Sequence, residues 1–124
     1  MKLHFSGARN GILIIDKENI SNYKADLLPV GGAFSRKSRK MSRKFTTQSI
    51  SITKDSWIIM HSDGYYDQLG GSKTMSMEPE KYKEIIQSAV KTNKDKKEFL
   101  MQEFEQWRKD FPQVDDLLII GLKV

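Results

Sequence analysis

The sequence predicts an α+β fold in which an antiparallel β-meander sheet is covered on one side by two antiparallel helices. Three observations lead to this fold class. Short apolar segments with a period of two occupy the first half of the chain and its end, while apolar residues recur at three- and four-residue steps in between. Polar turn residues separate these segments. The 124 residues suffice for one domain with a core but not for a second of ordinary size, so residues 1–124 are treated as a single domain.

The composition is that of a folded globular chain, with 38% hydrophobic and 30% charged residues. The absence of cysteine excludes disulfides and thiolate metal sites. The longest apolar runs, such as Ile12–Ile15 and Leu117–Ile120, are far shorter than the ~20 residues that cross a bilayer. The first residues alternate like a strand instead of forming a signal peptide. We therefore expect no membrane span, no secretion and a cytoplasmic location.

The first strands are predicted over about residues 2–9 and 12–16. Between them lies the pair Asn10-Gly11, which supplies the two positive φ angles that a type I′ turn requires. These two strands are therefore expected to pair as an antiparallel hairpin. After a polar turn, residues 20–26 can return as a third strand.

Three further strands are predicted. Ile50 and Ile52 share one face of a strand over about residues 47–53, because polar residues alternate with them. Residues 57–60 form an unbroken apolar run, which indicates a central strand covered on both faces. The last strand spans about residues 117–124, with alternate apolar residues on one side.

Two helices are predicted before the last strand. The first spans about residues 79–92 and has Pro79 in its first turn, where a proline costs no hydrogen bond. The second spans about residues 95–110, and Asp95 with Glu98 resembles a capping box at its start. Both have an apolar stripe at helical spacing. Such stripes normally cover a sheet, so we assign them to the core rather than to a cofactor pocket.

The positive charge of the chain is concentrated in residues 35–44. Of 21 basic residues, six lie here, and without them 15 basic and 16 acidic residues remain. The segment has no apolar periodicity, which predicts a solvated loop. Two other interpretations stay open: a docking patch for an acidic or phosphorylated partner, and a nucleic-acid contact, although no aromatic residues are present to stack on bases. The six residues are Arg36, Lys37, Arg39, Lys40, Arg43 and Lys44.

Acidic residues stand at the ends of two apolar strands. Asp63 follows the central strand, and Asp115 and Asp116 precede the last one. Strand ends hold side chains firmly yet open to solvent, as hard divalent cations require of their oxygen ligands. Two such carboxylates repel each other unless a cation lies between them. Asp-Gly and Asp-Asp are also ordinary turn and strand-start sequences, so the spacing alone leaves a metal site and simple turns as alternatives.

Four segments, taken together and in order, resemble the C-terminal half of a SpoIIE/RsbU-type serine phosphatase. These bacterial enzymes belong to the metal-dependent PPM, or 2C-class, protein phosphatases. The resemblance extends over almost the whole chain and includes the two helices between the last two segments. It implies that the chain forms half of a PPM phosphatase α-β-β-α sandwich. The segments are Phe5–Ala8, Leu28–Gly31, Ile59–Gly71 and Gln113–Gly121.

The resemblance also implies a site. In that family the aspartate of the Ser-Asp-Gly motif and the first aspartate of the Asp-Asp motif bind Mn²⁺ or Mg²⁺, which points here to Asp63 and Asp115, with Asp116 as a further candidate. The implied reaction is hydrolysis of phosphoserine or phosphothreonine by metal-activated water. His61 could donate a proton to the leaving serine, but a packed or indirectly acting histidine is the simpler interpretation.

One part of the family pattern has no match in this sequence. The family completes its metal pair with an aspartate and a glycine carbonyl in an N-terminal Asp-x-x-Gly-His-Gly-like segment, and the only Asp-Gly here is Asp63-Gly64. We therefore expect weak metal binding and little or no phosphatase activity from this chain by itself. We also expect the missing half to leave one sheet face bare, and a homo-oligomer to cover that face.

The first functional hypothesis is thus the C-terminal portion of a SpoIIE-type protein serine/threonine phosphatase in bacterial signalling. By resemblance, its substrate is a phosphorylated regulatory protein of the STAS type, an anti-sigma-factor antagonist. The alternative is a non-catalytic binding module or pseudophosphatase that acts by association through its sheet face or the basic loop. The third hypothesis is a nucleic-acid binder that acts through residues 36–44. We consider it the weakest of the three and predict that nucleic acid is not a partner.

Overall fold

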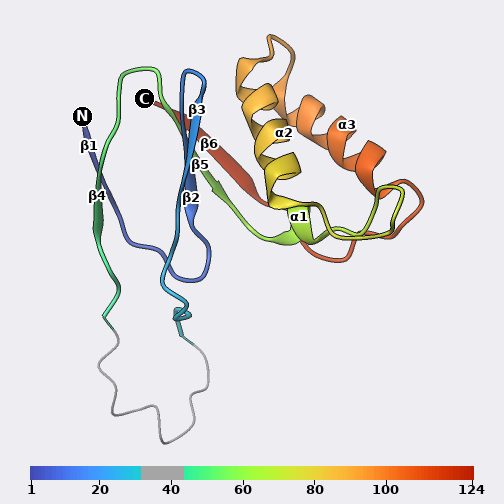
Figure 1. The fold of residues 1–124 in the computed structure, drawn as a ribbon, viewed down its shortest axis with the longest axis horizontal. Coiled ribbons are helices and arrows are strands. Elements are labelled where there is room, and N and C mark those ends of the chain that lie inside the picture. The colour runs from blue at the N-terminus through green and yellow to red at the C-terminus, as the bar shows by residue number, and fades with distance from the viewer. Residues whose placement is uncertain (32–43) are drawn as a thin grey trace, which may run out of the picture. The chain divides into compact units, whose positions relative to one another are not determined.

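A computed structural model of the chain describes residues 1–31 and 44–124 (Figure 1). Two compact units are present. Residues Met1–Met60 with Leu122–Val124 form the first, and residues His61–Gly121 form the second. The first contains most of the strands and the second contains the helices.

The strands belong to two sheets. A two-stranded sheet pairs β1 with β4, and a four-stranded sheet has the order β3, β2, β5, β6. The pairs β1–β4, β2–β3 and β2–β5 are antiparallel. The predicted α+β class with antiparallel sheets is confirmed, although the strands are divided between two sheets instead of following one another in a single meander. The strands are β1 (Lys2–Phe5), β2 (Ile12–Asp16), β3 (Asn19–Tyr23), β4 (Gln48–Ser51), β5 (Trp57–His61) and β6 (Ile119–Lys123).

The predicted hairpin between residues 2–9 and 12–16 is wrong. Strand β1 is short and pairs with β4, far along the chain, and the partner of β2 at the next turn is β3. The positive φ angle lies on Arg9, at 65°, and not on the Asn-Gly pair, so no type I′ turn forms. Gly11 is required for another reason: a Cβ atom there would collide with the carbonyl of Tyr23.

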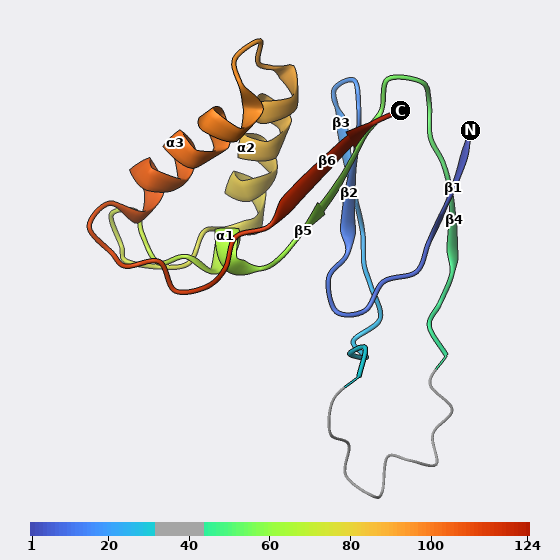
Figure 2. The same ribbon diagram turned by 180° about the vertical axis from the view of Figure 1, so that it is seen from behind.

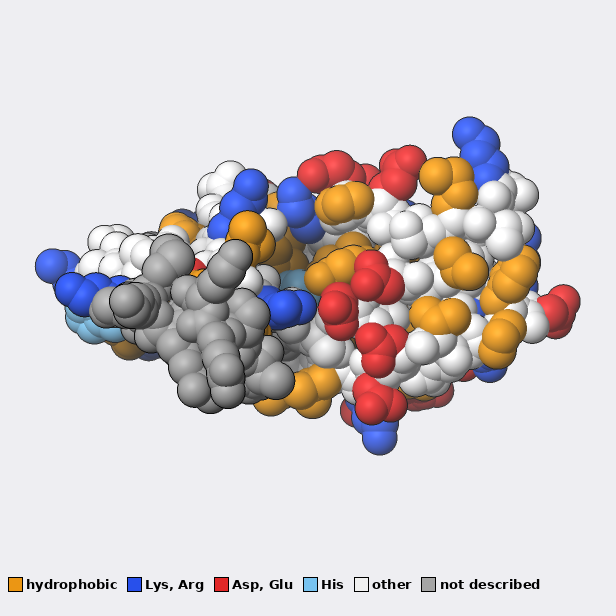
Figure 3. Space-filling view, turned by 90° about the horizontal axis from the view of Figure 1, so that it is seen from below, with side chains coloured by type: hydrophobic (Ala, Val, Ile, Leu, Met, Phe, Trp, Pro, Cys, Tyr) orange, Lys and Arg blue, Asp and Glu red, His pale blue; other side chains and the backbone are white. Residues whose placement is uncertain are grey.

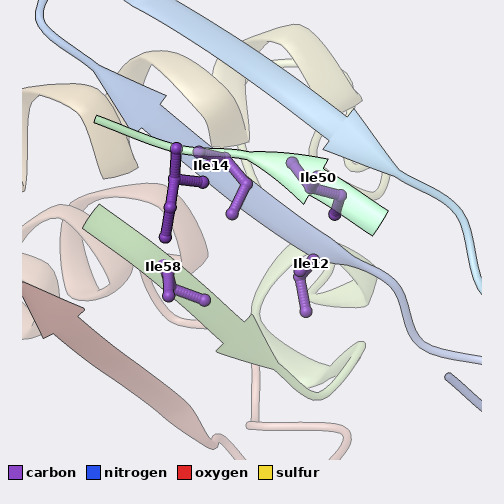
Figure 4. Close-up of a cluster of buried hydrophobic side chains, with 5 residues drawn as sticks. Ile12, Ile14, Ile50 and Ile58 are labelled. Carbon is purple, nitrogen blue, oxygen red and sulfur yellow. The ribbon is translucent and has the colours of Figure 1, made fainter. Parts of the chain in front are cut away.

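The core of the first unit is a cluster of isoleucines contributed by both sheets. Ile12, Ile14 and Ile58 project from β2 and β5, and Ile50 projects from β4 toward them (Figure 4). Ile50 is 4% exposed, in agreement with the inward face predicted for its strand. Strand β5 lies between β2 and β6, so its predicted central position is confirmed. The rest of the cluster consists of Ile52 and the partly buried Leu3, Phe5, Tyr23 and Val124.

The expectation of a bare sheet face does not hold for β2, where all of Ile12–Ile15 are at most 5% exposed. Exposed apolar side chains occur instead along the last strand. Leu118, just before β6, and Ile120 and Leu122 within it are 56%, 46% and 53% exposed, whereas Val124, predicted on the same side, packs on the isoleucine cluster. Burial of β2 weakens the reason given for a homo-oligomer, the exposed apolar residues at β6 support it, and the oligomer stays a prediction.

The second unit contains three helices, among which α2 and α3 pack side by side (Figures 1 and 2). Both of these long helices were predicted, and their ends agree within two residues. Asp95 caps α3 by accepting a hydrogen bond from the Glu98 amide at 2.8 Å. The short α1 has no counterpart in the sequence-based prediction, because four residues are too few for a periodic pattern. The helices are α1 (Gly64–Asp67), α2 (Pro79–Lys91) and α3 (Lys96–Arg108).

The core of the second unit is aromatic. Phe104 of α3 is fully buried, and its ring lies 5.2 Å from that of Tyr65 in α1, which in turn lies 5.5 Å from the ring of Tyr82 in α2. The Tyr65 hydroxyl donates to the Leu100 carbonyl at 2.8 Å. These contacts fix α1, and with it the start of the site, against both long helices.

No helix in the described ranges is long and apolar enough to cross a membrane. Of the basic cluster, only Lys44 lies within the described residues, and it is exposed. Arg36, Lys37, Arg39, Lys40 and Arg43 lie outside them, so the predicted loop and docking patch are not addressed by the structure.

Candidate metal centre

The first half of the site is a turn between a strand and a helix. Strand β5 ends at His61 and α1 begins at Gly64, so Ser62 and Asp63 form the connection. Asp63 occupies the N-cap position of α1, but its side chain makes no capping hydrogen bond. The Asp63 carboxylate is therefore not committed to the helix and stays available to another partner.

The second half is the segment Asp115–Asp116, which lies against this turn. A Cβ atom on Gly64 would collide with the Asp116 carbonyl and would lie 3.3 Å from the carbonyl carbon of Asp115. The glycine of the Ser-Asp-Gly motif is thus required by the close approach of two backbone segments. The Ser62 amide also donates to the Leu118 carbonyl at 2.9 Å. Residues more than fifty positions apart are brought together, as the metal-site hypothesis requires.

Two carboxylates of this region act on a third. Desolvation, followed by the negative charges of Asp63 and Asp115, raises the pKa of Asp67, the last residue of α1. Both aspartates are therefore close enough to act on the same third carboxylate. Figure 3 shows acidic side chains gathered next to one another on the face of the molecule seen from below. Such a group of carboxylates attracts cations.

The donor atoms suit a hard divalent cation, but their number is small. Carboxylate oxygens are the ligands that Mg²⁺ and Mn²⁺ prefer. Among residues 1–31 and 44–124, however, no three His, Cys, Asp or Glu side chains are arranged to hold a metal ion together. The Asp63 and Asp115 carboxylates have the chemistry of metal ligands, but two side chains are fewer than a metal ion requires. Asp116 is exposed, its amide donates to Oδ1 of Asp115 at 2.7 Å, and its carbonyl is held by Ser62 at 3.0 Å.

His61 belongs to an aromatic cluster at the end of β5. Its ring centroid lies 5.1 Å from that of Tyr82 and 5.7 Å from that of Tyr66. Burial lowers the pKa of His61, against the opposing effects of the Ser62 carbonyl and the Asp63 charge. The ring is therefore mostly neutral at pH 7, and Nδ1 lies 3.2 Å from the Ser62 carbonyl. These contacts are those of a packed histidine. The role of His61 as a proton donor stays a prediction.

One residue that the sequence did not single out joins the end of α1 to the segment that leads to Asp115. Gln68, directly after α1, is fully buried. Its side-chain amide donates to the Pro112 carbonyl at 2.9 Å, and its Oε1 accepts from the Val114 amide at 3.2 Å. No periodic pattern includes Gln68, because the segment that follows α1 is irregular. The only signal was its place inside the segment Ile59–Gly71, which carries the family resemblance.

Comparisons with known proteins place this geometry in a known fold. No protein-family model matches the chain, and no curated protein matches it. Solved structures do match. The PP2C domain of SiaA from Pseudomonas aeruginosa matches with a TM-score of 0.82 and 17% sequence identity, over 99% of this chain and 46% of that one.

Two structures of SpoIIE from Bacillus subtilis also match. One contains its PP2C phosphatase domain with a fragment of the regulatory domain, with a TM-score of 0.73 and 18% identity, over 99% of this chain and 34% of that one. The other contains its phosphatase domain, with a TM-score of 0.60 and 14% identity, over 98% of this chain and 50% of that one.

The chain therefore spans half or less of the length of each of these structures. At 14–18% identity the likeness concerns the fold, and it covers essentially every residue of this chain. The order of strands and helices, the turn that carries Asp63 and the segment that carries Asp115 are all part of what is matched. The chain thus has the fold of a partial PPM (PP2C-type) phosphatase domain.

Proposed function

We propose that this chain is the portion of a metal-dependent protein serine/threonine phosphatase that contributes Asp63 and Asp115 as ligands for Mn²⁺ or Mg²⁺. One observation carries the proposal. In a fold shared with PP2C phosphatase domains, the Ser-Asp-Gly turn and the Asp-Asp segment lie against each other at Gly64, and burial, followed by the charges of both aspartates, raises the pKa of Asp67. Carboxylates held together in this way repel each other, and a divalent cation relieves the repulsion.

The residues of this chain would contribute two negatively charged carboxylates at fixed positions. Asp63, free of a capping role, and Asp115, oriented by the Asp116 amide, present carboxylate oxygens at the ends of two strands. When bound, divalent cations supply water activation and charge neutralisation at a phosphoryl group. Because the described residues offer only part of a ligand set, we expect the chain by itself to bind metal weakly and to hydrolyse phosphoserine poorly or not at all.

The proposal includes a substrate class, a location and a state of assembly. The substrate class comes from the resemblance and the location from the sequence, while the assembly is supported by exposed apolar side chains. The substrate would be a phosphorylated STAS-type anti-sigma-factor antagonist in bacterial signalling. The protein would act in the cytoplasm. A homo-oligomer would cover the apolar side of β6, where Leu118, Ile120 and Leu122 are exposed.

Calorimetric titration with MnCl₂ tests the site. We expect a dissociation constant of about 10⁻⁴ M or weaker for the full chain, the range of open carboxylate sites with few ligands. Asp63→Asn and Asp115→Asn should each weaken binding by about tenfold or more, since each removes a charged ligand. Asp110→Asn, an equal change of charge at an exposed aspartate after α3, should bind like wild type.

Phosphate release from a phosphoserine peptide, with and without Mn²⁺, completes the test. We expect slow or undetectable release from the chain alone, and any release that does occur should require Mn²⁺ and disappear in Asp63→Asn. Absence of Mn²⁺ binding at millimolar concentration would remove the proposed site. Metal binding that survives in both ligand variants would place the cation elsewhere.

A second candidate function is a non-catalytic binding module. The observation that favours it is the lack of a three-ligand metal group within residues 1–31 and 44–124. Such a module would retain a phosphorylated partner without metal and without turnover. Retention of a phosphoserine peptide on the immobilised chain in the presence of a chelator, with no phosphate release after Mn²⁺ is restored, would favour the module over the enzyme.

A further inference from the structure

We propose that Ser62 and Gln68 are positioning residues that hold Asp115 in place beside Asp63. This inference rests on the proposed metal site. It states that two uncharged side chains fix the position of the Asp115 carboxylate relative to that of Asp63. Both side chains lie within the second unit, and each bonds a different part of the segment that contains Asp115.

Gln68 holds the residues before Asp115. Its Nε2 donates to the Pro112 carbonyl at 2.9 Å and to the Leu69 carbonyl at 3.0 Å, and its Oε1 accepts from the Val114 amide at 3.2 Å. Every polar atom of this fully buried amide thus has a partner. An apolar side chain of similar size would leave the Val114 amide and the Pro112 carbonyl without this partner.

The backbone around Gln68 is fixed as well. The Trp107 indole donates to the Gln68 carbonyl at 2.8 Å, and the Gly71 amide donates to the Trp107 carbonyl at 2.9 Å. A Cβ atom on Gly70 would collide with that same carbonyl, so the chain passes close to the end of α3. Gln68 is therefore a rigid point of attachment and not a mobile side chain that happens to reach the segment.

Ser62 holds the residues after Asp115. Its Oγ donates to the Asp116 carbonyl at 3.0 Å and accepts from the Leu118 amide at 3.0 Å. The Asp116 carbonyl and the Leu118 amide lie before β6, which begins at Ile119. The Ser62 hydroxyl therefore supplies both of these backbone groups with a hydrogen-bond partner.

The two anchors lie on either side of each aspartate. Along the chain, Ser62 directly precedes Asp63 and Gln68 follows the helix that Asp63 starts. Across the site, Gln68 bonds residues 112 and 114 while Ser62 bonds residues 116 and 118, so Asp115 is held from both sides. Fixing both ends of a short segment fixes the backbone that carries its central carboxylate.

The first experiment compares Gln68→Met with Gln102→Met in the full chain. Gln102 is an exposed glutamine of α3, which makes the second variant a matched control for the same chemical change. We expect the Val114 amide of Gln68→Met to exchange its hydrogen about tenfold faster, as loss of one hydrogen bond to a buried partner implies. We expect its Mn²⁺ affinity to fall by about 10- to 100-fold, the usual effect of removing an outer partner of a metal ligand.

The second experiment uses Ser62. Its substitutions remove or add fewer atoms than Gln68→Met does, so we expect them to leave the chain folded. Ser62→Ala removes the hydroxyl, and Ser62→Thr keeps it. We expect faster exchange of the Leu118 amide and about tenfold weaker Mn²⁺ binding in the alanine variant, with both restored toward wild type by threonine. Loss of apolar packing does not explain rescue by threonine. If Gln68→Met fails to fold, judged from amide protection of Ile86 in α2, the Ser62 pair decides the question.

The outcomes separate this inference from the proposed function. Wild-type exchange rates at Val114 and Leu118 in both variants would overturn the inference, and so would faster exchange with unchanged Mn²⁺ affinity. If the wild-type chain itself binds no Mn²⁺, the proposed function fails. The exchange rates alone then decide whether Ser62 and Gln68 hold the segment.

Discussion

The two compact units of this chain are held together by different kinds of interaction. The first unit depends mainly on apolar burial: its cluster contains four isoleucines from β2, β4 and β5 together with Ile52, and Leu13, Ile15 and Ile59 are buried as well. The second unit has a buried aromatic centre, but its irregular segments are held by side-chain hydrogen bonds from Ser62, Gln68 and Trp107 to backbone groups. The candidate aspartates all lie in the second unit.

This difference has a consequence for what each unit can do. Apolar burial is non-directional and tolerates small shifts, so it stabilises a sheet without fixing any one group precisely. Hydrogen bonds are directional, and a buried amide such as Gln68 accepts few alternative arrangements. The second unit therefore suits a site whose ligands must keep their positions, while the first contributes mainly to stability. Substitutions should separate the two properties.

The largest effect is expected from the isoleucine cluster. Ile14→Ala removes a buried side chain from the centre of β2 and should lower the free energy of unfolding by about 2–5 kcal/mol. The fraction that stays folded should bind Mn²⁺ with wild-type affinity, because no residue of the site is touched. Denaturant unfolding and calorimetry measure the two quantities. Leu27→Ala, at a residue that is 89% exposed, is the control and should change neither.

A smaller effect on stability, but a larger one on the site, is expected at Gly64. Gly64→Ala places a Cβ atom against the Asp116 carbonyl, and since a backbone atom cannot rotate away, the two segments must move apart. We expect a loss of about 1–3 kcal/mol of stability, as for other overpacked positions. Mn²⁺ binding should be lost at the same time. A variant that unfolds like wild type and binds Mn²⁺ normally would show that the close approach is not required.

The same contrast explains what the sequence could and could not predict. Strand β4 and helices α2 and α3 follow from the periodic spacing of their apolar residues, and β2 and β5 follow from short unbroken apolar runs. The turn at Lys17, with φ 52°, also followed from its polar residues, and β2 and β3 pair across it as a hairpin. Sheet partners were harder to predict. Strand β1 pairs with β4 because of Leu3 and Phe5, which pack on a core formed by distant residues.

The site was predictable only in part. Asp63 and Asp115 stand where apolar strands end, and their family resemblance singled them out. Ser62 and Gln68 could not be found in this way, because what matters is the backbone groups they meet, and Gln68 meets groups 44 and 46 residues away. A buried glutamine in an irregular segment has no period and no charge to mark it. Long-range hydrogen bonds from irregular segments are set by tertiary structure alone.

The smallest expected effect concerns Asp67, whose pKa is raised by burial and then by the negative charges of Asp63 and Asp115. The pKa of Asp67 in the folded chain lies above its ordinary value of 3.8. At pH values between these two pKa values, the folded chain therefore binds more protons than the unfolded chain. The contribution of Asp67 to stability is therefore full below pH 3.8 and is lost as the pH rises through the raised pKa. Asp67→Asn should thus stabilise the chain slightly at pH 7, which thermal unfolding can measure.

Titration of the Asp67 carboxyl by NMR makes this test specific to the site. Burial, the first cause of the shift, stays in every variant, so the pKa should fall only part of the way toward 3.8 in Asp63→Asn and in Asp115→Asn. Asp110→Asn should leave it unchanged, because Asp110 is not among the charges that act on Asp67. Saturating Mn²⁺ should lower it further than either substitution, since a cation replaces repulsion by attraction. If both ligand variants titrate like wild type, neither Asp63 nor Asp115 lies close enough to Asp67 to act on it, and the electrostatic support for a shared cation site is lost.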